Sequence, residues 1–119
     1  MAVDIVKNDL SASTHGRGIL VAATATLGTT IHTSRAVSSA GQFDEVWIWA
    51  VNTSASSVKL TIEYGGATSP NDHIEFTLLA ENGLYLMIPG LLMRNSQVIT
   101  AFAGTANVIV LHGFVNELG

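Results

Sequence analysis

The sequence of 119 residues contains no cysteine. Disulfide bonds and thiolate metal ligands are therefore excluded, and a reducing compartment is allowed. No secretory signal is recognisable near Met1, because Asp4 precedes Lys7 and no apolar stretch of about 7–15 residues follows. The uncharged residues 18–34 are rich in Thr, Ala and Gly, unlike a spanning helix of about 20 apolar residues. We therefore expect a soluble protein with no membrane partner.

Charge is scarce as well. Asp, Glu, Lys and Arg make up 12% of the residues, against about 25% in ordinary domains. Apolar residues make up 48% and the mean hydropathy is +0.41, the opposite of a disordered chain. Such a composition favours a surface that another subunit partly covers, and a monomer with a Ser- and Thr-rich surface is the alternative. The net charge is −4 and the five Lys and Arg residues are scattered, so no nucleic-acid partner is expected.

Apolar residues recur with a period of two along most of the chain. In residues 57–64, Val58, Leu60 and Ile62 alternate with polar residues that include Glu63, which predicts a strand with one face in water. Short clusters of turn residues separate such runs, and no amphipathic helix of ten or more residues lies between them. We predict an all-β fold: an antiparallel β-sandwich of about eight strands, jelly-roll-like, formed by residues 19–119. Residues 1–18 lack a clear period and are either a flexible terminus or an arm that orders against a neighbour.

Two of the predicted strands are apolar on both faces, namely residues 43–51 and 107–115. A strand of this kind is covered on both sides, so in a sandwich its second face meets a loop, the N-terminal segment or a second chain. The pair Trp47 and Trp49 fits three settings: packing between the sheets, a protein interface or a platform for glycans. We predict an interface made by these residues: Phe43, Trp47, Trp49, Val51, Ile109 and Leu111.

No sequence motif indicates catalysis or a bound metal. Ser, His and Asp are all present, but the G-x-S-x-G elbow is absent and a catalytic triad is defined by geometry. Asp72, His73 and Glu75 are close in sequence, yet zinc sites usually take three or four ligands and the other three histidines are isolated. The segment from Asn52 to Ser54 matches a glycosylation acceptor, a pattern that is common by chance. We therefore expect no enzyme activity, no cofactor and no metal site.

Much of the chain from Glu45 onward resembles small virion proteins of tailed bacteriophages. The segments that carry the resemblance are VWIWAVN at 46–52, LTIEYGG at 60–66, SPND at 69–72, IPGL at 88–91, AFAGTANV at 101–108 and GFVN at 113–116. They look like the capsid decoration, or cement, class: β-sandwiches that commonly sit as trimers on the head lattice. The resemblance implies a homotrimer, the major capsid protein as partner, and a place in the virion after assembly in the host cytoplasm. Residues 1–35 depart from that pattern, and a tail, neck or fibre-tip protein or a carbohydrate-binding module remain alternatives.

Overall fold

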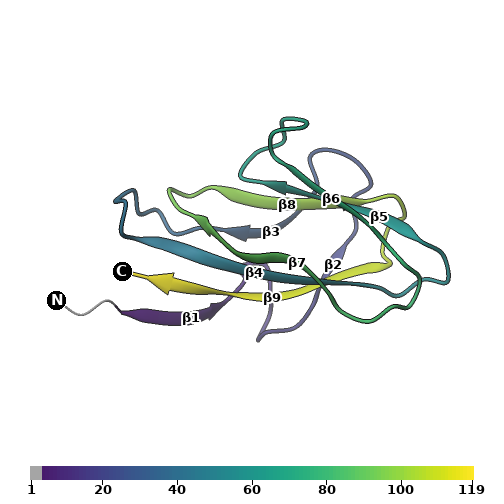
Figure 1. The fold of residues 1–119 in the computed structure, drawn as a ribbon, viewed down its shortest axis with the longest axis horizontal. Coiled ribbons are helices and arrows are strands. Elements are labelled where there is room, and N and C mark those ends of the chain that lie inside the picture. The colour runs from purple at the N-terminus through teal and green to yellow at the C-terminus, as the bar shows by residue number, and fades with distance from the viewer. Residues whose placement is uncertain (1–3) are drawn as a thin grey trace.

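The computed structural model describes residues 4–119, which form nine β-strands and no helix (Figure 1). The strands are β1 (Ile5–Asp9), β2 (Ile19–Val21), β3 (Thr29–Thr33), β4 (Phe43–Asn52), β5 (Val58–Tyr64), β6 (His73–Leu78), β7 (Tyr85–Met93), β8 (Val98–Ala103) and β9 (Ile109–Leu118). In the part of the chain that the structure describes, no helix is long and apolar enough to cross a membrane. The prediction of an all-β fold is confirmed.

The strands form two antiparallel sheets packed face to face. One sheet has the order β1-β9-β4-β7 with β2 also paired to β9, and the other has the order β3-β8-β5-β6. Because β1 pairs with the end of β9 and β2 with its beginning, the two short strands together form one interrupted edge strand. Counted in this way the sandwich has eight strand positions, and their order is that of a jelly roll.

The core lies between the sheets and follows the alternation of side chains along each strand. In β4 every second residue is buried, so that Val46 and Ile48 point inward while Trp47 and Trp49 point outward. Burying one such aliphatic side chain contributes about 1.5–3 kcal/mol. The largest fully buried apolar side chains are Leu10, Val21, Ile31, Val46, Ile48, Leu60, Ile62, Ile88, Ile99, Ile109 and Leu111.

Gly113 sets the closeness of the two longest strands. It lies opposite Ile48, and a Cβ atom at this position would collide with the backbone carbonyl oxygen of Trp47. Gly90 in β7 also leaves no room for a side chain, because φ is +82° and a Cβ atom there would press on the indole of Trp47. The neighbouring Pro89 is tolerated because β7 pairs only with β4 and so forms the edge of its sheet.

Strand β1 belongs to the five-stranded sheet but buries none of its residues. All five residues of β1 are exposed, whereas Leu10 directly after it is fully buried. In Figure 1, β1 runs beside the end of β9 at the lower edge of the sheet. Within the segment expected to be an arm or a flexible terminus, residues 5–9 therefore form a strand against the chain's own C-terminal strand. Residues 1–3 of that segment lie outside the described residues.

Candidate functional site

The outer surface of the five-stranded sheet carries a cluster of large apolar side chains. Strand pairing places Trp47 between Phe114 and Pro89, and Trp49 beside Leu86, all on one face. The ring centroid of Trp47 lies 6.1 Å from that of Trp49 and 6.4 Å from that of Phe114, and the centroids of Trp49 and Phe114 are 5.9 Å apart. All three aromatic side chains are partly exposed. We call these five residues the aromatic face.

The polar atoms beside the aromatic face are paired with one another. Glu45 Oε1 accepts hydrogen bonds from Trp47 Nε1 (2.8 Å) and from Asn116 Nδ2 (3.0 Å). These two bonds, that from Trp47 first, hold the pKa of Glu45 below its usual value. On the other side, Lys7 Nζ lies 4.5 Å from the ring centroid of Phe114, within the range of a cation–π contact. The rim is therefore polar but largely satisfied from within the chain.

The residues predicted to form an interface divide between two locations. Phe43, Trp47, Trp49 and Val51 lie on the outer side of β4 and are partly exposed. Ile109 and Leu111, in contrast, are fully buried in the core between the sheets. They do not belong to the outer surface, because β9 alternates without a bulge and pairs Trp49 with His112, one residue away from Leu111.

On the outer side of β9, Phe114 lies opposite Trp47 and His112 lies opposite Trp49, and Val110 lies opposite Val51. The alternation within residues 107–115 separates the two faces of this strand. The alternation cannot show which of these two faces lies on the same side of the sheet as Trp47. That depends on the register of β9 against β4.

A second cluster joins Ser11, His32, Asp44 and Arg35. The backbone N–H of Ser11 donates to His32 Nδ1 (2.9 Å), and Ser11 Oγ lies 3.2 Å from the same nitrogen. His32 Nε2 lies 2.9 Å from Asp44 Oδ2, and Arg35 Nε donates to Asp44 Oδ1 (2.9 Å). His32 and Asp44 are both buried, with 4% and 1% exposure. The sequence did not reveal that a serine, a histidine and an aspartate meet, because they lie on separate segments.

The hydrogen bonds of this cluster connect separate segments of the fold, and their arrangement differs from that of a hydrolytic triad. A triad needs a histidine nitrogen that is free to take the proton of the serine hydroxyl. Here the lone pair of His32 Nδ1 accepts the backbone N–H of Ser11, and Ser11 Oγ itself accepts the backbone N–H of Thr33. The carboxylate of Asp44 is not reserved for the histidine, because Arg35 pairs with its second oxygen. The expectation that the chain is no enzyme stays a prediction.

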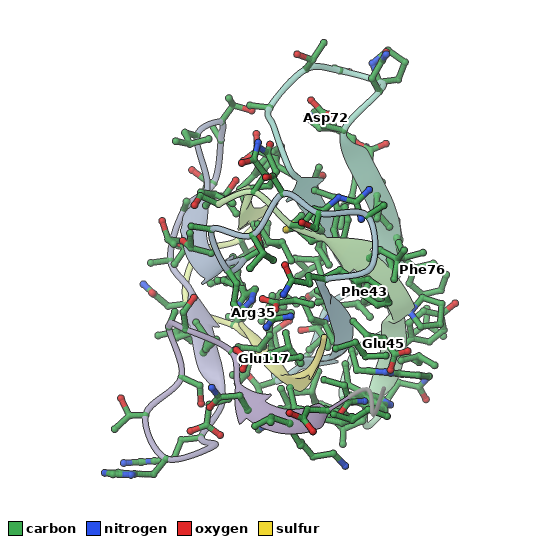
Figure 2. The ribbon with its side chains drawn as sticks, turned by 90° about the vertical axis from the view of Figure 1, so that its left-hand side faces the viewer. Arg35, Phe43, Glu45, Asp72, Phe76 and Glu117 are labelled. Atoms are coloured by element: carbon green, nitrogen blue, oxygen red, sulfur yellow. The ribbon has the colours of Figure 1, made fainter. Side chains whose placement is uncertain are left out.

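Arg35 extends this cluster to the end of the chain. Its Nη2 donates to the backbone carbonyl oxygens of Phe43 (2.8 Å) and Leu118 (2.9 Å). Figure 2 looks onto this end of the sandwich, with Arg35 near its middle and Asp72 far away in the uppermost loop. The cluster therefore ties β3, β4 and β9 together at one end.

A buried carboxylate appears where the sequence predicted a solvated one. Glu63 is fully buried, a correction to the expectation that it faces water. Its Oε1 accepts from Gly28 N (2.8 Å) and Thr100 Oγ1 (2.6 Å), and its Oε2 accepts from Thr26 Oγ1 (2.8 Å). The segment between β2 and β3 thus covers this part of β5, and alternation within β5 cannot reveal a cover supplied by another segment.

The acidic cluster near β6 does not converge on one point. Asp72 accepts the backbone N–H of Thr68, His73 Nε2 lies 3.9 Å from Glu63 Oε2, and Glu75 pairs with Lys59 at 3.2 Å. Among residues 4–119, no group of three or more His, Cys, Asp or Glu side chains is arranged to hold a metal ion.

Comparisons with known proteins add no relative. No protein-family model matches the chain, and neither the curated proteins nor the solved structures contain a match. The aromatic face and the architecture that presents it are therefore the basis for assigning a function.

Proposed function

We propose that this chain is a structural subunit that associates with copies of itself through the aromatic face. The observation that carries the proposal is that Trp47, Trp49 and Phe114 form one partly exposed apolar surface on a stiff sheet. Interfaces between proteins are enriched in aromatic residues at their centres and have polar rims. The paired Glu45 and Asn116 at the rim fit that pattern, because burying them leaves few polar atoms without partners.

The same proposal includes a particular setting: a capsid decoration protein that binds the major capsid protein on a phage head, as a trimer. Jelly rolls serve in viral capsid proteins and in lectins, so the architecture is compatible with this role by analogy. The resemblance of the segments after Glu45 to decoration proteins supports the virion setting. The aromatic face fits a tail, neck or fibre-tip location equally well, and the identity of the neighbouring genes discriminates among these locations.

The experiment is light scattering coupled to size exclusion at micromolar concentration. The proposal expects a mass of about three times the 12.5 kDa of one chain. Trp49→Glu puts a charge at the centre of the aromatic face and is expected to give the mass of a single chain. The matched control is Leu79→Glu, which replaces a side chain that is 59% exposed and lies outside the aromatic face, and it should retain the assembly.

A single-chain mass for the unsubstituted protein overturns the proposal. In that case a glycan-binding role for the Trp47 and Trp49 surface is the hypothesis to test. Binding on a glycan array that disappears in Trp49→Ala, with the circular dichroism spectrum unchanged, would support that role.

A further inference from the structure

Strand β1 contributes nothing to the core of its own chain. Each of the other eight strands buries at least one residue, whereas all five residues of β1 are exposed. Two of them are aliphatic: Ile5 is 65% exposed and Val6 is 52% exposed. Strands β2 to β9 therefore make a complete eight-stranded sandwich, and β1 is an addition to its edge.

The contacts of the N-terminal segment with the core and with the second sheet begin at Leu10. Leu10 is fully buried, the Ser11 N–H donates to His32 Nδ1, and the Ala12 N–H donates to the carbonyl oxygen of Ile31 (3.1 Å). Of the residues that the structure describes before Leu10, namely residues 4–9, none has a hydrogen bond of this kind to the second sheet. A change of direction between Asp9 and Leu10 can therefore move β1 without disturbing the core.

Among the described residues, β1 pairs with the last part of β9 and with no other strand. The pairing runs from Ile5 opposite Leu118 to Asp9 opposite Phe114, and the Gly119 N–H donates to the Asp4 carbonyl oxygen (3.1 Å). The cation–π interaction of Lys7 with the Phe114 ring is made to the same strand. A second copy of this chain offers an identical stretch of β9, so each of these interactions can form equally well between two chains.

We propose that β1 is an exchangeable strand, which in the assembled protein leaves its own β9 and pairs with β9 of a neighbouring copy. Exchange of an identical element is a low-cost route to association, because every hydrogen bond that breaks within one chain forms again between two chains. Because the exchanged pairing with β9 reproduces the same contacts, the net gain must come from additional contacts of the neighbouring copy with Ile5 and Val6, which are exposed in the single chain.

The strand also has the right position for this exchange. Five extended residues span about 17 Å, so the neighbour's β9 must lie close to the rim of the aromatic face. Asp9 is paired with Phe114, and Phe114 is paired with Trp47, so the exchanged strand would flank the same surface. The inference rests on the proposed self-association through that surface and specifies how neighbouring subunits are fastened.

The absence of cysteine makes a direct test straightforward. Ile5 and Leu118 face each other, and the bond from Gly119 to Asp4 indicates that they form a non-hydrogen-bonded pair, whose geometry suits a disulfide. One chain carries Ile5→Cys alone and a second chain, lengthened by a tag, carries Leu118→Cys alone. The two are unfolded, mixed, refolded together and oxidised. Neither position is buried, and circular dichroism checks that each variant folds.

Exchange predicts that most of the product on a non-reducing gel is a disulfide-linked pair of one short and one tagged chain. Each variant oxidised by itself should give far less crosslinked product, because Ile5 does not face a second Ile5 in an exchanged ladder. As a complement, the chain with both substitutions should form covalent species of two or more chains.

The opposite result is a doubly substituted chain that closes its disulfide within one chain, with no mixed product from the single variants. If the unsubstituted protein is an assembly by light scattering, that result overturns strand exchange and leaves the proposed function intact. A single-chain mass for the unsubstituted protein overturns both.

Discussion

His32 on β3 and Asp44 on β4 join the two sheets of the sandwich, with 2.9 Å between His32 Nε2 and Asp44 Oδ2. Because His32 Nδ1 accepts the Ser11 N–H, the ring proton lies on Nε2 and is donated to the carboxylate. Arg35 holds the second carboxylate oxygen. One buried carboxylate thereby connects both layers and the segment that follows β1.

Removing this carboxylate should be severely destabilising. Asp44→Ala leaves His32 and Arg35 without their shared acceptor, and breaking a buried ion pair by removing one partner typically costs about 3–5 kcal/mol. The loss is measured as the change in unfolding free energy in urea, followed by tryptophan fluorescence. Glu75→Ala is the control, since Glu75 pairs with Lys59 on the surface and such pairs are worth about 1 kcal/mol or less. Equal losses in the two variants would contradict the anchoring role of Asp44.

The buried Glu63 predicts a dependence of stability on pH. Burial raises the pKa of this carboxyl, but hydrogen bonds from Thr100, Gly28 and Thr26 and the charge of His73 outweigh it, and the pKa is lowered overall. A lowered pKa in the folded state means that the ionised group stabilises the fold above its unfolded value of about 4.3. That contribution disappears as the pH falls from the unfolded pKa through the folded pKa.

Unfolding free energies of the unsubstituted chain and of Glu63→Gln between pH 7 and pH 3 measure this contribution. The variant should be less stable at pH 7 by about 1–3 kcal/mol, because a neutral amide replaces a carboxylate that accepts three hydrogen bonds. The difference should shrink as the pH falls. A difference that stays constant down to pH 3 would show that the ionised form of Glu63 does not stabilise the fold.

Gly113 should not tolerate a side chain. Gly113→Ala drives a methyl group into the backbone of β4 at Trp47, which cannot move without shifting the whole strand, so we expect a loss of about 3 kcal/mol in unfolding free energy. Gly41→Ala is the matched control, because an added Cβ meets nothing within 4 Å there and φ is not positive. That variant should change the stability by no more than about 0.5 kcal/mol. Similar effects of the two substitutions would refute the close approach of β4 and β9.

Asn52 should act as a structural side chain and not as a glycan acceptor. Its Nδ2 donates to the carbonyl oxygens of Ser56 (2.8 Å) and Leu78 (3.0 Å), and the residue is 1% exposed. Asn52→Ala leaves those carbonyls without a donor and should cost about 2–3 kcal/mol, whereas Asn82→Ala on an exposed turn should be nearly neutral. Mass spectrometry after expression through a eukaryotic secretory pathway should find Asn52 unmodified. A glycan on Asn52 of the folded chain would contradict the burial.

The sequence predicts those features of the fold that depend on local pattern. Alternation along β4 correctly separates Trp47 and Trp49 from Val46 and Ile48, because a strand has only two faces. What pattern cannot supply is the pairing between distant strands. Ile109 and Leu111 are assigned to the wrong side of the molecule for this reason, since only the register of β9 against β4 decides which face joins the tryptophans.

The buried polar side chains could not be predicted from the sequence for a related reason. Glu63 has the alternation of an exposed residue, and its burial depends on donors from Thr26 and Gly28, more than thirty residues earlier in the sequence. The Ser11, His32 and Asp44 cluster likewise assembles from three segments that only the completed jelly roll brings together. Long-range interactions of this kind leave no local periodicity in a single sequence.

The pairing of β1 and β2 with β9 has a consequence for how the chain folds. The residues at the two ends, from Asp4 to Gly119, meet in one ladder, so the five-stranded sheet requires pairing between the most distant parts of the sequence. Closing so long a loop costs conformational entropy before strand pairing can stabilise the chain. Topologies of this kind therefore fold slowly. A circular permutant that joins the ends and opens at the exposed Gly83 turn makes this pairing local. We therefore expect the permutant to fold faster than the original chain. Its native sandwich should keep the same packing.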